Sequence, residues 1–184
     1  MFKYVMGAAV ALTISTPVFA ADFTGPRAEA RLGWETPTVS GDGDVYKLGS
    51  AVSYGGEIGY DLKAGRNLTV GAYGSFEKSS VKECDSGYCL GVDYNWQAGG
   101  RVGLGFGRAQ GYVKLGYSSL KLNANVDTLS GSETKGGVGG GIGVDVNAGK
   151  HLYWGVEANY SDFGQIEGIN FQRRQVAAKV GVRF

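Results

Sequence analysis

Residues 176–184 alternate strictly between apolar side chains and small or cationic ones. One face would carry Val176, Ala178, Val180, Val182 and Phe184, and the other Ala177, Lys179, Gly181 and Arg183. Because side chains of a β-strand point alternately to its two faces, this segment predicts a strand with one apolar and one cationic face. Such a strand is an aggregation hazard in water unless its edges are paired. A closed membrane barrel pairs both edges and turns the apolar face to lipid, so the pattern favours that architecture.

Residues 1–20 have the pattern of a secretory signal peptide. Lys3 supplies the positive start, residues 5–14 are apolar, and Val18-Phe19-Ala20 forms a small-x-small cleavage site. The alternative is a short membrane-anchoring helix, but polar residues and Pro17 interrupt the stretch before it reaches spanning length. We expect cleavage before Ala21, which leaves residues 21–184 as one domain exported through the periplasm to the bacterial outer membrane.

Composition excludes several classes of protein. Hydrophobic residues make up 43 %, yet no apolar run after the leader approaches the length of a transmembrane helix. Gly is 33 of 184 residues with only 3 Pro, which argues against collagen and against a Pro-rich disordered chain. Aromatic residues, at 12 %, are too frequent for disorder. A formal net charge of +1 gives no electrostatic footprint for nucleic acid.

Alternating patterns recur along the mature chain in eight segments near the length that a tilted membrane strand needs. They are residues 28–35, 52–62, 68–76, 96–106, 112–118, 137–146, 152–160 and 176–184. The sequence therefore predicts an all-β fold, an eight-stranded antiparallel up-and-down transmembrane barrel.

The connections between these segments alternate in length. The short ones, rich in turn residues, are 63–67, 107–108 and 147–150, and the long polar ones are 36–50, 78–93, 121–135 and 161–172. Transmembrane barrels have short periplasmic turns and long outer loops, so the order fits a periplasmic N-terminus. A soluble lipocalin-like barrel or β-sandwich also alternates, but the leader and the terminal aromatic favour apolar side chains on the outside.

Aromatic residues sit near the ends of the apolar faces, as in the girdles of membrane barrels. The outer girdle is predicted to contain Trp34, Phe76 and Trp96, and the periplasmic girdle Tyr60, Phe106 and Trp154.

Residues 155–164 read Gly-Val-Glu-Ala-Asn-Tyr-Ser-Asp-Phe-Gly, and the aromatic-ended last strand follows. This hairpin resembles that of small opacity-like outer-membrane proteins, and more narrowly the alphaproteobacterial "porin family" surface-antigen group. The resemblance implies an eight-stranded barrel in the outer membrane. The chain end also resembles the C-terminal signal that the barrel assembly machinery recognises, which here would comprise Val180, Val182 and Phe184.

Charged residues gather on the predicted inward faces. They are Glu29, Arg31, Glu35, Glu57, Asp61, Arg101, Lys114, Asp145, Glu157, Lys179 and Arg183. A near-balanced set predicts a salt-bridge network that fills the lumen, since eight strands leave a narrow interior. The alternative is an ion-selecting lining. The inward glycines, among them Gly137, Gly139, Gly141 and Gly143, would permit coiling, make room for neighbours, or leave a narrow wet passage.

Cys84 and Cys89 are the only cysteines, both in the second long connection. In an exported chain this spacing predicts a disulfide that closes a small loop. Zinc would need more ligands than two cysteines and one distant His. Asp42 and Asp44 supply too few carboxylates for calcium, and we expect no metal and no cofactor.

No catalytic constellation is visible. The single His, His151, adjoins a short turn and would lie on the periplasmic side, away from outer-leaflet substrates. We expect a non-enzymatic barrel, monomeric, surrounded by outer-membrane lipid and lipopolysaccharide, that supports envelope integrity and presents its loops to a host or surface ligand. The alternative function is a narrow, low-conductance pore for water or small solutes.

Overall fold

The computed structural model describes residues 23–41, 44–47, 50–80, 82–85, 88–126, 129–166 and 169–184. Side chains are described for residues 23–38, 50–80, 93–121, 134–164 and 171–184. The predicted signal peptide lies outside these residues.

The described chain forms ten β-strands. They are β1 (Gly25–Gly41), β2 (Asp44–Lys47), β3 (Ala51–Lys63), β4 (Leu68–Ser79), β5 (Lys82–Asp85), β6 (Tyr88–Phe106), β7 (Ala109–Val126), β8 (Leu129–Asn147), β9 (Leu152–Ile166) and β10 (Ile169–Arg183). Eight of them make the barrel wall, while β2 pairs only with β1 and β5 only with β6. Among the described residues no helix is long and apolar enough to cross a membrane.

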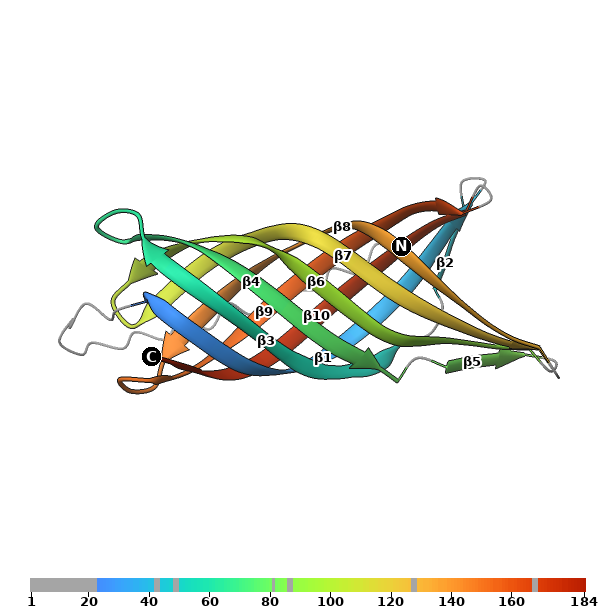
Figure 1. Ribbon diagram of the computed structural model, residues 1–184, viewed down its shortest axis with the longest axis horizontal. Helices are drawn as coiled ribbons and strands as arrows, with labels where there is room; N and C mark the ends of the chain where they lie inside the picture. Colours follow the sequence, from blue (N-terminus) through green and yellow to red (C-terminus); the bar gives the residue numbers. More distant parts are fainter. Residues whose placement is uncertain are drawn as a thin grey trace, which may run out of the picture.

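The barrel closes between its first and last wall strands. Its strands follow the order β1–β3–β4–β6–β7–β8–β9–β10, and β10 returns to pair with β1. This closing pair is antiparallel and runs from Arg27↔Arg183 to Ser40↔Asn170. Figure 1 shows the strands tilted across the long axis of the barrel, with the C-terminus at the end that carries the short turns. The predicted eight-stranded antiparallel barrel is confirmed.

Burial alternates along the wall strands as predicted, with the polar side chains inside. On β1 Trp34 is 58 % exposed and the adjacent Glu35 is 0 % exposed. On β10 Val180 is 50 % exposed and Lys179 is 5 % exposed. This is the reverse of a water-soluble protein, which buries its apolar side chains, and it is the arrangement that lipid outside and polar groups inside require.

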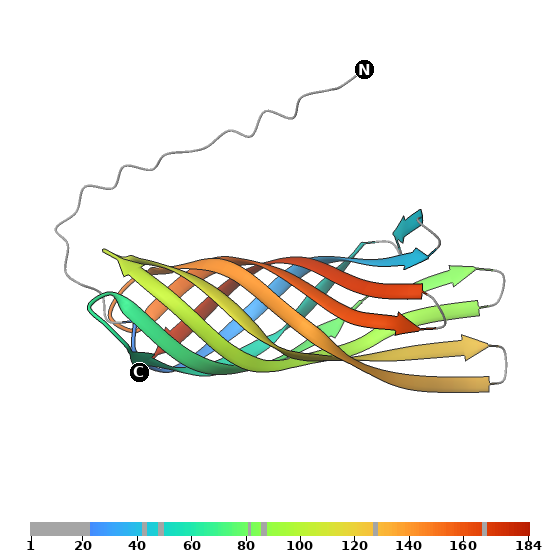
Figure 2. The ribbon, with the colours of Figure 1, turned by 90° about the horizontal axis from the view of Figure 1, so that it is seen from above.

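The four polar connections predicted as long loops are mostly strand, and that prediction is wrong. β7 and β8 pair without interruption from Ala109↔Val146 to Val126↔Leu129, which includes most of residues 121–135. In Figure 2 the paired ends of the strands extend to the right, away from the short turns. Antiparallel pairing satisfies backbone N–H and C=O groups whatever the side chains are. A strand pair in water on both faces needs no apolar alternation, so the pattern that marks the barrel wall is lost there.

The membrane band of the wall can be tested with a charge on its outer face. Val102 and Ile142 both lie opposite Val113 on β7, midway along the barrel, and both are exposed. Replacing either by Arg should lower the free energy of unfolding by about 2–4 kcal/mol, because a cation at mid-membrane depth leaves water for hydrocarbon. Urea unfolding in phospholipid vesicles measures this.

The matched control is Leu62→Arg, at the end of β3 beside the short turn. There the same cation reaches the headgroup layer, and the expected loss is about 0–1 kcal/mol. Equal losses at all three positions would contradict the assigned membrane band.

Candidate functional site

Seven acidic and seven basic side chains are buried inside the described part of the barrel, so their formal charges balance. They are Arg27, Glu29, Arg31, Glu35, Glu57, Asp61, Glu77, Arg101, Lys114, Asp145, Glu157, Arg173, Lys179 and Arg183. Removing a charge from water is costly unless an opposite charge and hydrogen bonds replace the lost hydration. The geometry of the pairs therefore decides what this interior can do.

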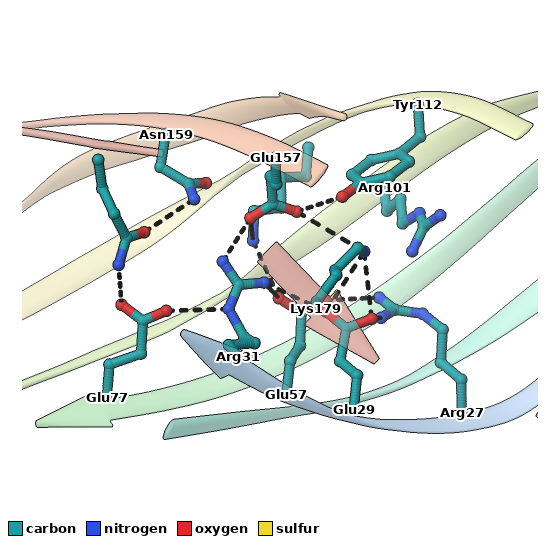
Figure 3. Close-up of polar contacts among 12 residues, drawn as sticks. Arg27, Glu29, Arg31, Glu57, Glu77, Arg101, Tyr112, Glu157, Asn159 and Lys179 are labelled. Carbon is teal, nitrogen blue, oxygen red and sulfur yellow. Dashed lines mark hydrogen bonds and ion pairs between the residues drawn. The ribbon is translucent and has the colours of Figure 1, made fainter. Parts of the chain in front are cut away.

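Four of these residues form a closed ring of alternating charge, here called the central charge ring. Arg31 Nη1 on β1 lies 2.8 Å from Glu57 Oε2 on β3, and the same oxygen lies 2.9 Å from Lys114 Nζ on β7. Lys114 Nζ lies 2.6 Å from Glu157 Oε1 on β9, and that oxygen lies 2.5 Å from Arg31 Nη2. Since β1 and β3 lie across the barrel from β7, the ring spans the lumen. Figure 3 shows three of its members, Arg31, Glu57 and Glu157, among the surrounding polar side chains.

Two tyrosines and a lysine hold the acids around this ring. The Tyr112 hydroxyl donates to Glu157 Oε2 at 2.5 Å, and the Tyr153 hydroxyl donates to Glu29 Oε2 at 2.7 Å. Lys179 Nζ lies 3.1 Å from the same Glu29 oxygen. The two tyrosine contacts join β7 to β9 and β9 to β1, which are not neighbouring strands, and the lysine contact joins the neighbours β10 and β1.

Above the ring, toward the long strand ends, a second group continues the network. Arg31 Nε donates to Glu77 Oε1 at 2.9 Å, and Arg173 Nη2 lies 2.8 Å from Glu77 Oε2. Arg173 Nε also donates to Glu35 Oε2 at 2.6 Å, and Gln175 Nε2 donates to Glu77 at 2.8 Å. Arg31 therefore links the central and upper layers.

Below the ring, two aspartates are shared among cations from other strands. Asp145 Oδ2 lies 2.6 Å from Arg101 Nη2, and Asp145 Oδ1 lies 2.9 Å from Lys179 Nζ. Asp61 Oδ2 lies 3.2 Å from Arg27 Nε.

Arg183 occupies the mouth at the short-turn end. Its guanidinium lies 3.7 Å from Asp61 and 4.9 Å from the centre of the Tyr153 ring. On its other side it lies 5.4 Å from the Phe23 ring. The charged network thus continues from this mouth to Glu35 without a break.

The space beside the inward glycines is occupied by neighbouring residues. A Cβ at Gly143 would collide with the Tyr112 hydroxyl, and one at Gly141 would collide with Asn159. At Gly137 the obstacle is the backbone of β9. Of the three readings of these glycines, the geometry therefore supports both room for large polar side chains and close approach of coiled strands.

Every predicted inward charge lies inside the barrel, and the network brings them together. Among the side chains that the structure describes, three buried charges were missed: Arg27, Glu77 and Arg173. Each lies an even number of residues from an inward-facing residue of a predicted strand, just beyond the predicted end of that strand. Extending the alternation by a few residues would therefore have found them.

The predicted girdle residues all lie on the outer surface of the barrel, exposed to the surroundings: Trp34, Tyr60, Phe76, Trp96, Phe106 and Trp154. Trp96 packs against Tyr117, with ring centres 5.6 Å apart. Val180, Val182 and Phe184 point outward too, and their role as an assembly signal stays a prediction.

Cys84 and Cys89 lie directly opposite each other in the β5–β6 pair. Their side chains are outside the described set, so the disulfide stays a prediction, with a register that suits it. Asp42 lies outside the described residues. Among the residues that the structure describes, no cluster of three His, Cys, Asp or Glu side chains could hold a metal ion. His151 lies at the short-turn end, and its Nδ1 donates to the Arg183 carbonyl oxygen at 2.8 Å.

The family model for the outer membrane protein beta-barrel domain matches residues 6–184. The chain belongs to this family. The predicted location in the bacterial outer membrane is thereby confirmed, and so is the resemblance to small outer-membrane barrels, while the opacity-like label stays a prediction. No curated protein sequence matches the chain significantly.

Solved structures of small outer-membrane proteins share the fold. Neisserial surface protein A (NspA) is 16 % identical, with a TM-score of 0.57 over 85 % of this chain and 97 % of its own. Ail, the attachment invasion locus protein of Yersinia pestis, is 15 % identical, with a TM-score of 0.54 over 86 % of this chain and 99 % of its own. OprG from Pseudomonas aeruginosa is 11 % identical, with a TM-score of 0.50 over 90 % and 98 %.

The central charge ring makes a quantitative prediction about stability. Arg31→Gln or Glu157→Gln alone should each cost about 3–5 kcal/mol, because each leaves a buried charge without its partner. The double variant should cost less than the sum of the two, with a coupling of about 0.5–3 kcal/mol. Urea unfolding of the four proteins in vesicles measures the cycle.

The control is the pair Arg31→Gln and Thr69→Ala. Thr69 is buried in another layer and contacts Gln110 rather than the ring. These two changes should add, and a coupling as large as that of Arg31 with Glu157 would contradict a direct interaction in the ring.

Proposed function

We propose that this protein is a non-enzymatic, non-conducting barrel that supports the integrity of the outer membrane and presents its long strand ends for surface recognition or adhesion. One observation carries the non-conducting part of the proposal. The central charge ring crosses the lumen with ion-pair distances of 2.5–2.9 Å between side chains that are at most 2 % exposed, which supports a closed layer.

The recognition part rests on the strand ends opposite the short turns. These paired strands continue for several residues past the outer girdle (Figure 2). The girdle residue Trp96 lies opposite Ser119 on β7, whereas β7 reaches Val126 and β8 begins at Leu129. A rigid scaffold that carries exposed connecting segments is the usual arrangement for binding surfaces. Ail, which shares this fold, is named for attachment and invasion and has been crystallised with the heparin analogue sucrose octasulfate.

Planar-bilayer recording tests the closed lumen. The purified protein should give no stepwise conductance. Replacing Arg31 and Glu157 together by Ala removes one acid and one base from the ring and should open steps, since the interior charge stays balanced while side chains that cross the lumen are lost.

The matched control is Arg173→Ala with Glu35→Ala, a pair outside the ring, which should remain silent. Stepwise conductance of the unmodified protein would make the narrow pore the correct function and would refute the non-conducting proposal.

Shortening one hairpin tests recognition. Asn123 and Ser132 lie opposite each other in the β7–β8 pair, so residues 124–131 can be replaced by an Asn-Gly turn without changing the register. Bacteria that lack other adhesins and express this variant should bind cultured epithelial cells less than those that express the full chain.

The barrel of the shortened variant should remain folded, as judged by heat-modifiable migration in gels. The role of this surface in adhesion would be contradicted if bacteria with the full chain, with the shortened variant and with neither protein bound the epithelial cells equally.

The last strand is also proposed to guide assembly by adding its edge to the assembly machinery. Phe184 is 73 % exposed at the rim, so its own burial contributes little to stability. Deleting Phe184 should lower the amount of protein in the outer membrane more than it lowers the unfolding free energy of protein refolded in detergent. The control is Leu62→Ala, an exposed apolar residue of the same rim, which should leave the assembled amount unchanged. Normal assembly without Phe184 would reduce it to a girdle residue.

A further inference from the structure

The three short turns share a composition that neither the fold nor the proposed function requires. Each contains a glycine followed directly by a cation: Gly65-Arg66, Gly107-Arg108 and Gly149-Lys150. Gly107 has φ +63°, which explains a glycine at that turn but not the cation after it. Lys63 adds a fourth cation, so every turn at this end is basic.

These cations are exposed. Lys63, Arg66, Arg108 and Lys150, here called the cationic collar, all point into the surroundings of the barrel end, and none of them forms an ion pair with another described residue. They come from three turns joining β3–β4, β6–β7 and β8–β9, which lie around the rim rather than on one side. Figure 1 shows these turns at the left end, beside the C-terminus.

The nearby acids do not neutralise the collar. Among the described residues at this end, Asp61 is 1 % exposed and Asp145 is 0 % exposed. Both are already paired inside the barrel, Asp61 with Arg27 and Asp145 with Arg101. Neither aspartate is therefore available to pair with the collar, which leaves the rim rich in exposed positive charge.

The collar lies at the edge of the apolar band. Lys63 directly follows the exposed Leu62, and Arg108 comes two residues after the exposed Phe106. At about 3.3 Å per residue, these cations lie within a few ångströms of the hydrocarbon edge, which is the depth of lipid headgroups. A soluble partner would have to compete with lipid for them.

From these observations we infer that the cationic collar binds the headgroups of anionic phospholipids in the leaflet that faces the periplasm. Each turn offers one Gly-cation pair, so separate headgroups can bind around the rim. At this rim a lipid can place its acyl chains against the apolar band and its anionic phosphate against a cation of the collar. The attraction between phosphate and cation should decline with salt. The enrichment expected from one cation near an anionic surface is on the order of fivefold.

The three tryptophans of the chain provide the probe. Trp154, on β9, lies at the collar end, whereas Trp34 and Trp96 lie at the other end. Replacing Trp34 and Trp96 by Phe leaves Trp154 as the reporter of lipid next to the collar. The protein is refolded into vesicles of phosphatidylcholine with one minor component, either acyl-brominated phosphatidylglycerol or acyl-brominated phosphatidylcholine at the same mole fraction.

Brominated phosphatidylglycerol should quench Trp154 more strongly than brominated phosphatidylcholine does at low salt, with the excess reduced at high salt. In the variant with Arg66→Gln, Arg108→Gln and Lys150→Gln, which keeps only Lys63 of the collar, most of the excess should be lost. The matched control removes three cations at the opposite rim, Lys78→Gln, Lys121→Gln and Arg174→Gln, and should leave the excess at Trp154 unchanged.

Circular dichroism and heat-modifiable migration establish that each variant is folded. Equal quenching of Trp154 by the two lipids would overturn the inference and would leave the collar for a soluble periplasmic partner. An excess that is undiminished in the collar variant, or that is lost only in the opposite-rim variant, would also overturn it.

Discussion

A chain that crosses hydrocarbon has no water with which to pair its backbone N–H and C=O groups, and each unpaired group costs free energy. The β1–β10 pairing meets this constraint, because it joins the first and last strands of the wall over Arg27↔Arg183 to Ser40↔Asn170. Without that closure, two strand edges would face lipid. The tilt of the strands and the enclosure of the interior both follow from it.

Closure also explains why the interior is so highly charged. Because the apolar face of each strand contacts lipid, the other face lines the lumen with polar groups. The lumen of an eight-stranded barrel is narrow, so these groups have to fill it. Charged side chains reach across such a lumen, and they are tolerated there because seven acids meet seven bases. Arg31 illustrates this, since it contacts Glu29, Glu57, Glu77 and Glu157 from four different strands. The same contacts that neutralise the interior obstruct it, which is why we favour a closed barrel over a pore.

The two ends of the molecule are built differently, and the difference suggests a division of roles. At one end the strands are joined by tight turns that carry the cationic collar at headgroup depth. At the other, strand pairs continue past the membrane band into water, with β2 and β5 as additional short arms. The first end fits contact with lipid, and the second fits contact with molecules outside the cell.

The sequence by itself determined the class of fold and the inward or outward direction of the residues in the eight predicted segments, and it predicted that the short turns share one end of the barrel. It could do so because a period of two is local information, and lipid on one side makes that period strong. The extent of the strands was not determined, since residues 121–135 have no apolar face in water and yet pair fully in the β7–β8 hairpin. Nor could the sequence say which inward charges meet. The contact of Arg31 with Glu157, 126 residues apart, depends on the curvature of the closed barrel, which brings β1 and β9 to within the reach of their side chains. Local alternation gives a side chain its direction, and only closure of the wall gives it its partner.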